Sequence, residues 1–220
     1  MREAYQLELG SLADELASMC SMVGDAMALA TRALLETNLS IAEDVISGDE
    51  KIDNARSACE EHAYALLALQ APVATDLRTV LAAIHAAESL ERMGDLALHV
   101  AKAARRRHPV PVIPAPIHEY FAQMGRVAVQ LARSAEAVIH SQDVAAARAL
   151  DEADDEMDDL HRHLFTVLMD KDWSHGVAAA VDVTLLGRFY ERYADHAVSV
   201  AKRVVFVVTG RMPGSEHEDV

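Results

Sequence analysis

The chain has 220 residues with a formal net charge of −15, and 51% of the residues are hydrophobic although only 5% are aromatic. This length allows one or two domains with a sizeable core, and a composition rich in alanine, leucine and valine favours closely packed helices. The negative charge argues against non-specific binding to nucleic-acid phosphates, so we expect no nucleic-acid partner.

The first helix is expected from about Ala4 to Thr37, because apolar residues recur there at a spacing of three and four. Ser40 and Glu43 form an S-x-x-E pattern, which predicts a capping box at the start of the second helix. The sequence QAP ends that helix, and we expect Pro72 in the first turn of the third. The third helix ends in three arginines, which suit a helix C-terminus.

Four prolines between residues 109 and 116 predict an extended linker. After it the plan repeats, with helices expected at about 117–140, 143–170 and 174–209. These patterns predict a first three-helix repeat at 1–108, a Pro-rich linker at 109–116, a second three-helix repeat at 117–211 and a disordered acidic tail at 212–220.

The two halves align with each other. With an offset of 105, DEKID at 49–53 falls on DDEMD at 154–158, and with an offset of 100 the E-R-x-x-D at 91–95 falls on that at 191–195. The composition predicts about 0.1 copies of E-R-x-x-D, so two copies at matched positions indicate a repeat. The change of offset places a five-residue deletion at the turn before the last helix. We therefore predict an all-α fold of two tandem three-helix bundles, six long helices related by pseudo-twofold symmetry.

The repeated motifs place paired carboxylates on helix faces, since residues four apart share one face. If the second and third helices of each repeat are neighbours, four carboxylates meet in each: Asp49, Asp53, Glu91 and Asp95 in the first, and Asp154, Asp158, Glu191 and Asp195 in the second. Such clusters are costly unless neutralised. A metal ion such as Mg²⁺, Ca²⁺, Mn²⁺ or iron would neutralise them, and so would Arg92, Arg192 or the nearby Arg78, so both a metal site and an ion-pair network stay open.

Other residues give little sign of catalysis. The chain lacks the Glu-x-x-His of ferritin-like di-iron bundles, a nucleophile elbow, a glycine-rich phosphate loop and a dinucleotide fingerprint. We therefore expect no catalytic residues, no organic cofactor, no enzyme activity and no high-affinity phosphate site. His99 and His161 lie one turn after Asp95 and Asp158, where they either join the sites or serve as interface residues; His196 should point away from the carboxylates.

Two segments resemble the PhoU family. LQAPVATDLRTVLAAIHAAESLERMGDLALHVAK carries elements similar to that family's P-V-A-x-D-L-R and E-R-x-x-D, and LLGRFYERYADHAVSVAKRVVFVVTG resembles the matching part of its second repeat. The similarity covers nearly the whole chain and implies a PhoU-like fold. It also implies metal clusters, often of iron or zinc, held by the eight carboxylates named above. Arg188 stands where Glu88 stands in the first repeat, and WSHGVAAAVDV replaces the P-V-A-x-D-L-R element, so the two sites should differ in charge and affinity.

The resemblance implies a function as well. It implies a cytoplasmic negative regulator of phosphate uptake and phosphate-starvation signalling. Such a protein would be an adaptor between the ATPase subunit of a phosphate ABC transporter and a sensor histidine kinase. We also expect a homodimer, because Ala-rich helices can leave an apolar face for a second copy. The alternatives are a carboxylate-liganded metal-binding or metal-storage helical protein, or a carboxylate-bridged metalloenzyme.

Overall fold

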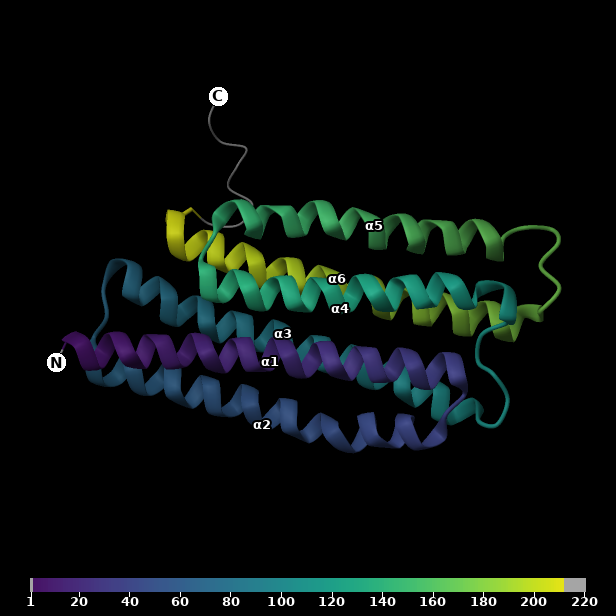
Figure 1. Ribbon diagram of the computed structural model, residues 1–220, viewed down its shortest axis with the longest axis horizontal. Coiled ribbons are helices and arrows are strands. Elements are labelled where there is room, and N and C mark those ends of the chain that lie inside the picture. The colour runs from purple at the N-terminus through teal and green to yellow at the C-terminus, as the bar shows by residue number, and fades with distance from the viewer. Residues whose placement is uncertain (1, 212–220) are drawn as a thin grey trace, which may run out of the picture.

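The computed structural model describes residues 2–211, which contain six long α-helices and no strand (Figure 1). The predicted all-α fold is therefore confirmed, and the predicted acidic tail at 212–220 lies outside the described residues. The elements in chain order are α1 (Arg2–Glu36), α2 (Leu39–Gln70), α3 (Ala74–Arg107), the short 3₁₀ helix η1 (Ala115–Ile117), α4 (His118–Ser141), α5 (Val144–Leu168) and α6 (Gly176–Thr209).

The predicted capping box at the start of α2 is wrong. Asn38 is the N-cap, and its side chain accepts a hydrogen bond of 3.2 Å from the backbone N–H of Ile41. Asn caps as well as Ser does, and because it comes two residues earlier Ser40 lies inside the helix. Glu43 lies 3.6 Å from Arg105 of α3 and forms an ion pair there. Pro72 likewise precedes its helix, since α3 begins at Ala74.

The Pro-rich linker is less extended than predicted. Its last residues form η1, which includes Pro116, a residue that the first turn of a helix tolerates. Val112, Ile113 and Ile117 are buried in the hydrophobic core. The linker therefore packs against the helices that it connects.

The two three-helix units pack side by side, with the second unit displaced along the long axis of the bundle (Figure 1). α1 packs on α4 and α3 packs on α6, in both cases antiparallel, while α2 lies against α1 and α3 and α5 lies against α4 and α6. These contacts have the symmetry of a pseudo-twofold axis that exchanges the units. The second unit is shorter because α4 has 24 residues where α1 has 35, and α5 has 25 residues where α2 has 32.

The contact between α1 and α4 depends on a glycine. A Cβ atom on Gly125 would lie 2.6 Å from Cγ2 of Thr31, so only a residue without a side chain allows this approach. The Thr31 hydroxyl lies 2.8 Å from the carbonyl oxygen of Met27 and 2.8 Å from the hydroxyl of Tyr190. Helices α1, α4 and α6 are thereby fixed together at one buried point.

The arginines at the end of α3 join the two units. Arg106 donates to Oδ1 of Asp182 on α6 at 2.9 Å, and Nε of Arg107 donates to Oδ2 at 2.9 Å. Asp182 is 7% exposed, so both of its oxygens need these donors. Besides placing positive charge at the C-terminus of α3, Arg106 and Arg107 therefore connect the first unit to the second.

Candidate carboxylate sites

The first cluster brings together carboxylates of α2 and α3. Asp49, Glu91 and Asp95 are half-buried and Asp53 is exposed. The pKa of Asp49 is raised by burial and then by the charges of Asp53 and Asp95. The pKa of Glu91 is raised by burial and, against the opposing effect of Arg92, by Asp95 and Asp53. The four side chains therefore share one electrostatic environment, as the spacing predicted.

Arg92 neutralises part of this first cluster. Its Nη1 donates to Oδ2 of Asp95 at 2.9 Å, and its Nε lies 3.5 Å from Oε2 of Glu91. Lys102 and His99 also lower the pKa of Asp49, although burial outweighs them. Arg78 is not one of the neutralising residues here, because its Nε donates to the carbonyl oxygen of Val207 on α6.

The second cluster, on α5 and α6, is less well neutralised. Burial raises the pKa of Asp154 to about 7, and the charges of Asp195, Asp158 and Asp151 add to this effect. The pKa of Glu191 is raised by burial and then by Asp195, against the opposing effect of Arg188. Within the described part of the chain, Oδ1 of Asp154 and Oε2 of Glu191 are buried and have no hydrogen-bond partner.

A different arginine serves the second cluster. Arg188, which replaces Glu88 of the first unit, donates to Oε1 of Glu191. Arg192, the counterpart of Arg92, forms no ion pair within residues 2–211. The predicted difference in charge between the two carboxylate clusters therefore has a physical basis. The arginine that pairs with the first cluster follows Glu91, whereas the arginine that pairs with the second lies one turn before Glu191.

Residues that the sequence motifs did not indicate lie at the edge of the second cluster. An open pocket of about 180 Å³ there is lined by Asp151, Asp154, Asp195 and Lys202, among others. Lys202 lies 2.9 Å from Asp151 and pairs with it. Lys202 and Lys102 are equivalent under the offset of 100, so the repeat itself could have identified both lysines.

The histidines lie beside the clusters. His99 is exposed and stacks on Phe189 of α6 with ring centroids 5.2 Å apart. His161 packs edge-on against Phe165, and burial, followed by the charge of Arg188, lowers its pKa. His196 lies between α3 and α6, where burial and the charge of Arg192 lower its pKa.

The fit of these clusters to a metal ion differs between the units. Across residues 2–211, no group of three or more His, Cys, Asp or Glu side chains has an arrangement that could hold a metal ion. Nevertheless, the unpartnered oxygens of Asp154 and Glu191 have the chemistry that a hard cation needs. In the first unit Arg92 already satisfies Asp95 and Glu91 in part. The second cluster is therefore the one that, within the described residues, keeps buried carboxylate oxygens without a protein partner.

Comparison with known proteins identifies the family. A family model described as the PhoU domain matches residues 16–104 and again residues 121–204, once in each three-helix unit. The chain belongs to the PhoU family. The Phosphate-specific transport system accessory protein PhoU homolog 2 of Mycobacterium tuberculosis is 58% identical over 97% of this chain and all of its own length. PhoU homolog 1 of Mycobacterium leprae is 57% identical over 97% of this chain and 96% of its own.

Solved PhoU structures show the same fold. The phosphate transport system regulatory protein PhoU from Streptococcus pneumoniae superposes with a TM-score of 0.86 over 95% of this chain and 99% of its own, at 24% identity. PhoU from Pseudomonas aeruginosa superposes with a TM-score of 0.82 over 94% of this chain, at 23% identity. Within residues 2–211, no helix is both long and apolar enough to cross a membrane.

Proposed function

We propose that this PhoU-family chain is a cytoplasmic negative regulator of phosphate uptake and phosphate-starvation signalling. It acts without catalysis, as an adaptor between the ATPase subunit of a phosphate ABC transporter and a sensor histidine kinase. The observation that carries this proposal is the 58% identity, over almost the full chain, to a protein named as an accessory protein of a phosphate-specific transport system. Deleting the gene should derepress phosphate uptake in phosphate-rich medium, and the tagged chain should capture both partners. Failure of both results would contradict the adaptor role.

Two exposed apolar patches support an adaptor with two partners. The first patch, at the connection from α2 to α3, consists of Tyr64, Leu69, Val73, Leu77 and Leu81. The second patch, at the connection from α5 to α6, consists of Phe165, Met169, Val177, Val181 and Leu185. The two connections lie at opposite ends of the bundle (Figure 1). Clustered apolar side chains on a protein surface mark interaction sites, so one molecule offers a separate surface to each partner.

Aspartates in the second patch should remove one partner and leave the other. The double variant Val177→Asp/Val181→Asp places charges on side chains that are 80% and 51% exposed, so folding should be unaffected while an apolar contact is lost. We expect binding of one partner to weaken at least tenfold, which is about 1.4 kcal/mol, in a surface-immobilised binding assay. Circular dichroism should show unchanged helix content.

The matched control is Leu77→Asp/Leu81→Asp, at the equivalent positions of the first patch. It should weaken binding of the other partner. Light scattering of both variants also tests the proposed homodimer, because a patch that a second copy covers would yield a monomer when it is charged. Two variants that bind both partners normally and keep the wild-type mass would show that neither patch is an interface.

Cation binding by the second cluster is a second candidate role, and the unpartnered oxygens of Asp154 and Glu191 favour it. The bound ion would supply positive charge to these carboxylates. Elemental analysis of protein purified without chelator or nickel should find a divalent or iron cation, and Asp154→Asn/Asp195→Asn should reduce its content at least tenfold. Asp49→Asn/Asp53→Asn should reduce it less, since Arg92 already neutralises that cluster. Many ions per chain would indicate storage, and equal content in all variants would exclude these sites.

A further inference from the structure

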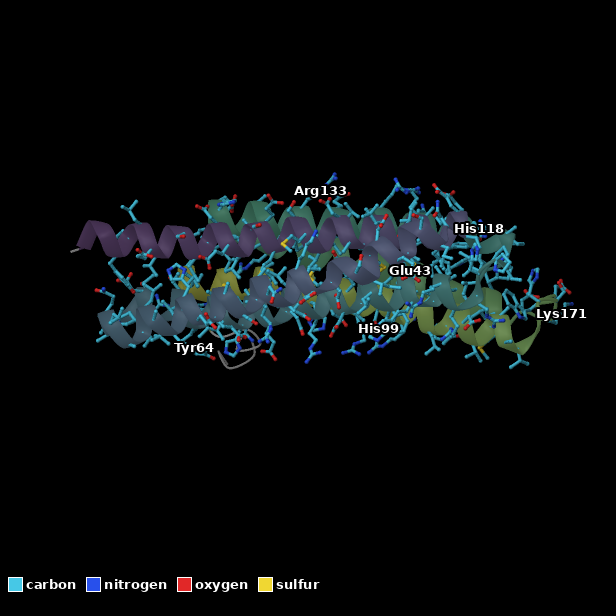
Figure 2. The ribbon with its side chains drawn as sticks, turned by 90° about the horizontal axis from the view of Figure 1, so that it is seen from below. Glu43, Tyr64, His99, His118, Arg133 and Lys171 are labelled. Carbon is cyan, nitrogen blue, oxygen red and sulfur yellow. The ribbon has the colours of Figure 1, made fainter. Side chains whose placement is uncertain are left out.

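A pocket lies between α3 and α6, on the seam between the two units. We call it the seam pocket. It is lined by Arg92, Asp95, Leu96 and His99 from α3 and by Arg192 and His196 from α6. The pocket is open to solvent and has a volume of about 180 Å³. Figure 2 shows His99 on the opposite side of the bundle from Arg133 of α4.

The seam pocket straddles the pseudo-twofold axis. Arg92 and Arg192 are equivalent under the offset of 100, and so are Leu96 and His196. Because α3 and α6 are antiparallel, the symmetry brings the arginine of each E-R-x-x-D motif to the same place. Arg92 of one motif and Arg192 of the other line the same pocket, together with Asp95. The duplication therefore creates a site that neither unit has alone.

The charges in the seam pocket are incompletely balanced. Arg92 pairs with Asp95 and lies near Glu91, but Arg192 forms no ion pair within residues 2–211. Two guanidinium groups in one pocket repel each other unless an anion lies between them. His99 and His196 add two ring nitrogens that can donate hydrogen bonds. Asp95 is the acidic residue of the lining, and Glu88 and Asp195 act electrostatically on His196 from outside it.

We propose that the seam pocket binds a tetrahedral oxyanion, either inorganic phosphate or a phosphoryl group on another molecule. Guanidinium groups donate paired hydrogen bonds that match the oxygens of a phosphate, and these charge-assisted bonds are about twice as strong as neutral ones. The guanidinium group of Arg192, which is unpaired within the described part of the chain, can donate two hydrogen bonds to the anion. Arg92 can donate two more when the anion displaces Asp95, and the two histidines supply further N–H donors. Since the pocket is open and Asp95 competes, binding is weak and reversible.

This inference does not depend on the adaptor role, because it concerns the isolated chain. Calorimetric titration of the full chain, in a chloride buffer that contains a chelator, should show saturable binding of inorganic phosphate or of O-phosphoserine. Tighter binding of inorganic phosphate identifies the free ion as the ligand, and tighter binding of O-phosphoserine identifies a phosphorylated partner. Arg192→Gln should weaken binding at least tenfold, while the control Arg133→Gln, on the opposite side of the bundle, should change it less than twofold (Figure 2).

Asp95→Asn makes the test independent of any general loss of structure. Removing this carboxylate frees Arg92 for the ligand, so the dissociation constant should fall severalfold. A damaged fold cannot produce tighter binding. The proposal is overturned if neither ligand binds saturably, if Arg192→Gln and Arg133→Gln have equal effects, or if Asp95→Asn weakens binding.

Discussion

Gly125→Val should lower the free energy of unfolding by about 3 kcal/mol, because the new side chain has no room between α1 and α4. A Cβ atom at this position would lie 2.6 Å from Cγ2 and 2.8 Å from Oγ1 of Thr31. Thr31 cannot turn away freely, since its hydroxyl bonds to the carbonyl oxygen of Met27 and to the hydroxyl of Tyr190. The clash must therefore either separate the helices or break these two buried hydrogen bonds. Urea denaturation followed by circular dichroism measures the loss.

A glycine inside α2 supplies the control. No atom lies within 4 Å of a Cβ built on Gly48, so Gly48→Ala should raise the free energy of unfolding by about 0.5–1 kcal/mol through helix propensity. The two substitutions thus have opposite signs although both replace a helical glycine. A Gly125→Val protein as stable as the wild type would show that α1 and α4 do not cross at this residue.

The sequence predicted the helices well because their signals are long and periodic. All six observed helices begin and end within a few residues of the predicted positions. The errors lie where two local choices compete. Asn38 and Ser40 are both residue types that cap helices well. Asn38 is the N-cap of α2 because its side chain accepts a hydrogen bond from the N–H of Ile41. The linker was predicted to be extended because proline is excluded from helix interiors, yet Pro116 lies in the first turn of the short helix η1, where proline is tolerated.

The carboxylate clusters were predictable from spacing, but the partners of these carboxylates were not. The i,i+4 rule placed Asp154 with Asp158 and Glu191 with Asp195 on shared faces. Nothing in a helical pattern says whether the arginine before or after Glu191 reaches it, and the structure selects Arg188. Arg192 instead reaches the seam, a surface that exists only because two units pack together. Contacts between units come from tertiary packing and leave no local signal.

Removing the charge of Asp154 should stabilise the protein at pH 8. Burial raises the pKa of this carboxyl from 3.8 to about 7, so the folded chain binds a proton more readily than the unfolded chain. Stability therefore falls as the pH rises from about 4 to about 7, and above that range the folded chain must hold an unfavourable charge. The full displacement of the pKa corresponds to about 4 kcal/mol, and we halve it to about 2 kcal/mol because the carboxyl is partly exposed.

Asp154→Asn should therefore be about 2 kcal/mol more stable than the wild type at pH 8 and equally stable near pH 3, where Asp154 is neutral in both states. Asp155→Asn, at the exposed neighbouring residue, is the matched control variant. Urea denaturation across this pH range measures both variants, and a gain that is the same at pH 3 and pH 8 would rule out the charge as its cause. If the cluster binds a divalent cation, as proposed above, adding that cation should reverse the sign, because it would stabilise the ionised carboxyl of the wild type alone. The Asn variant thus separates proton binding by Asp154 from the proposed cation binding.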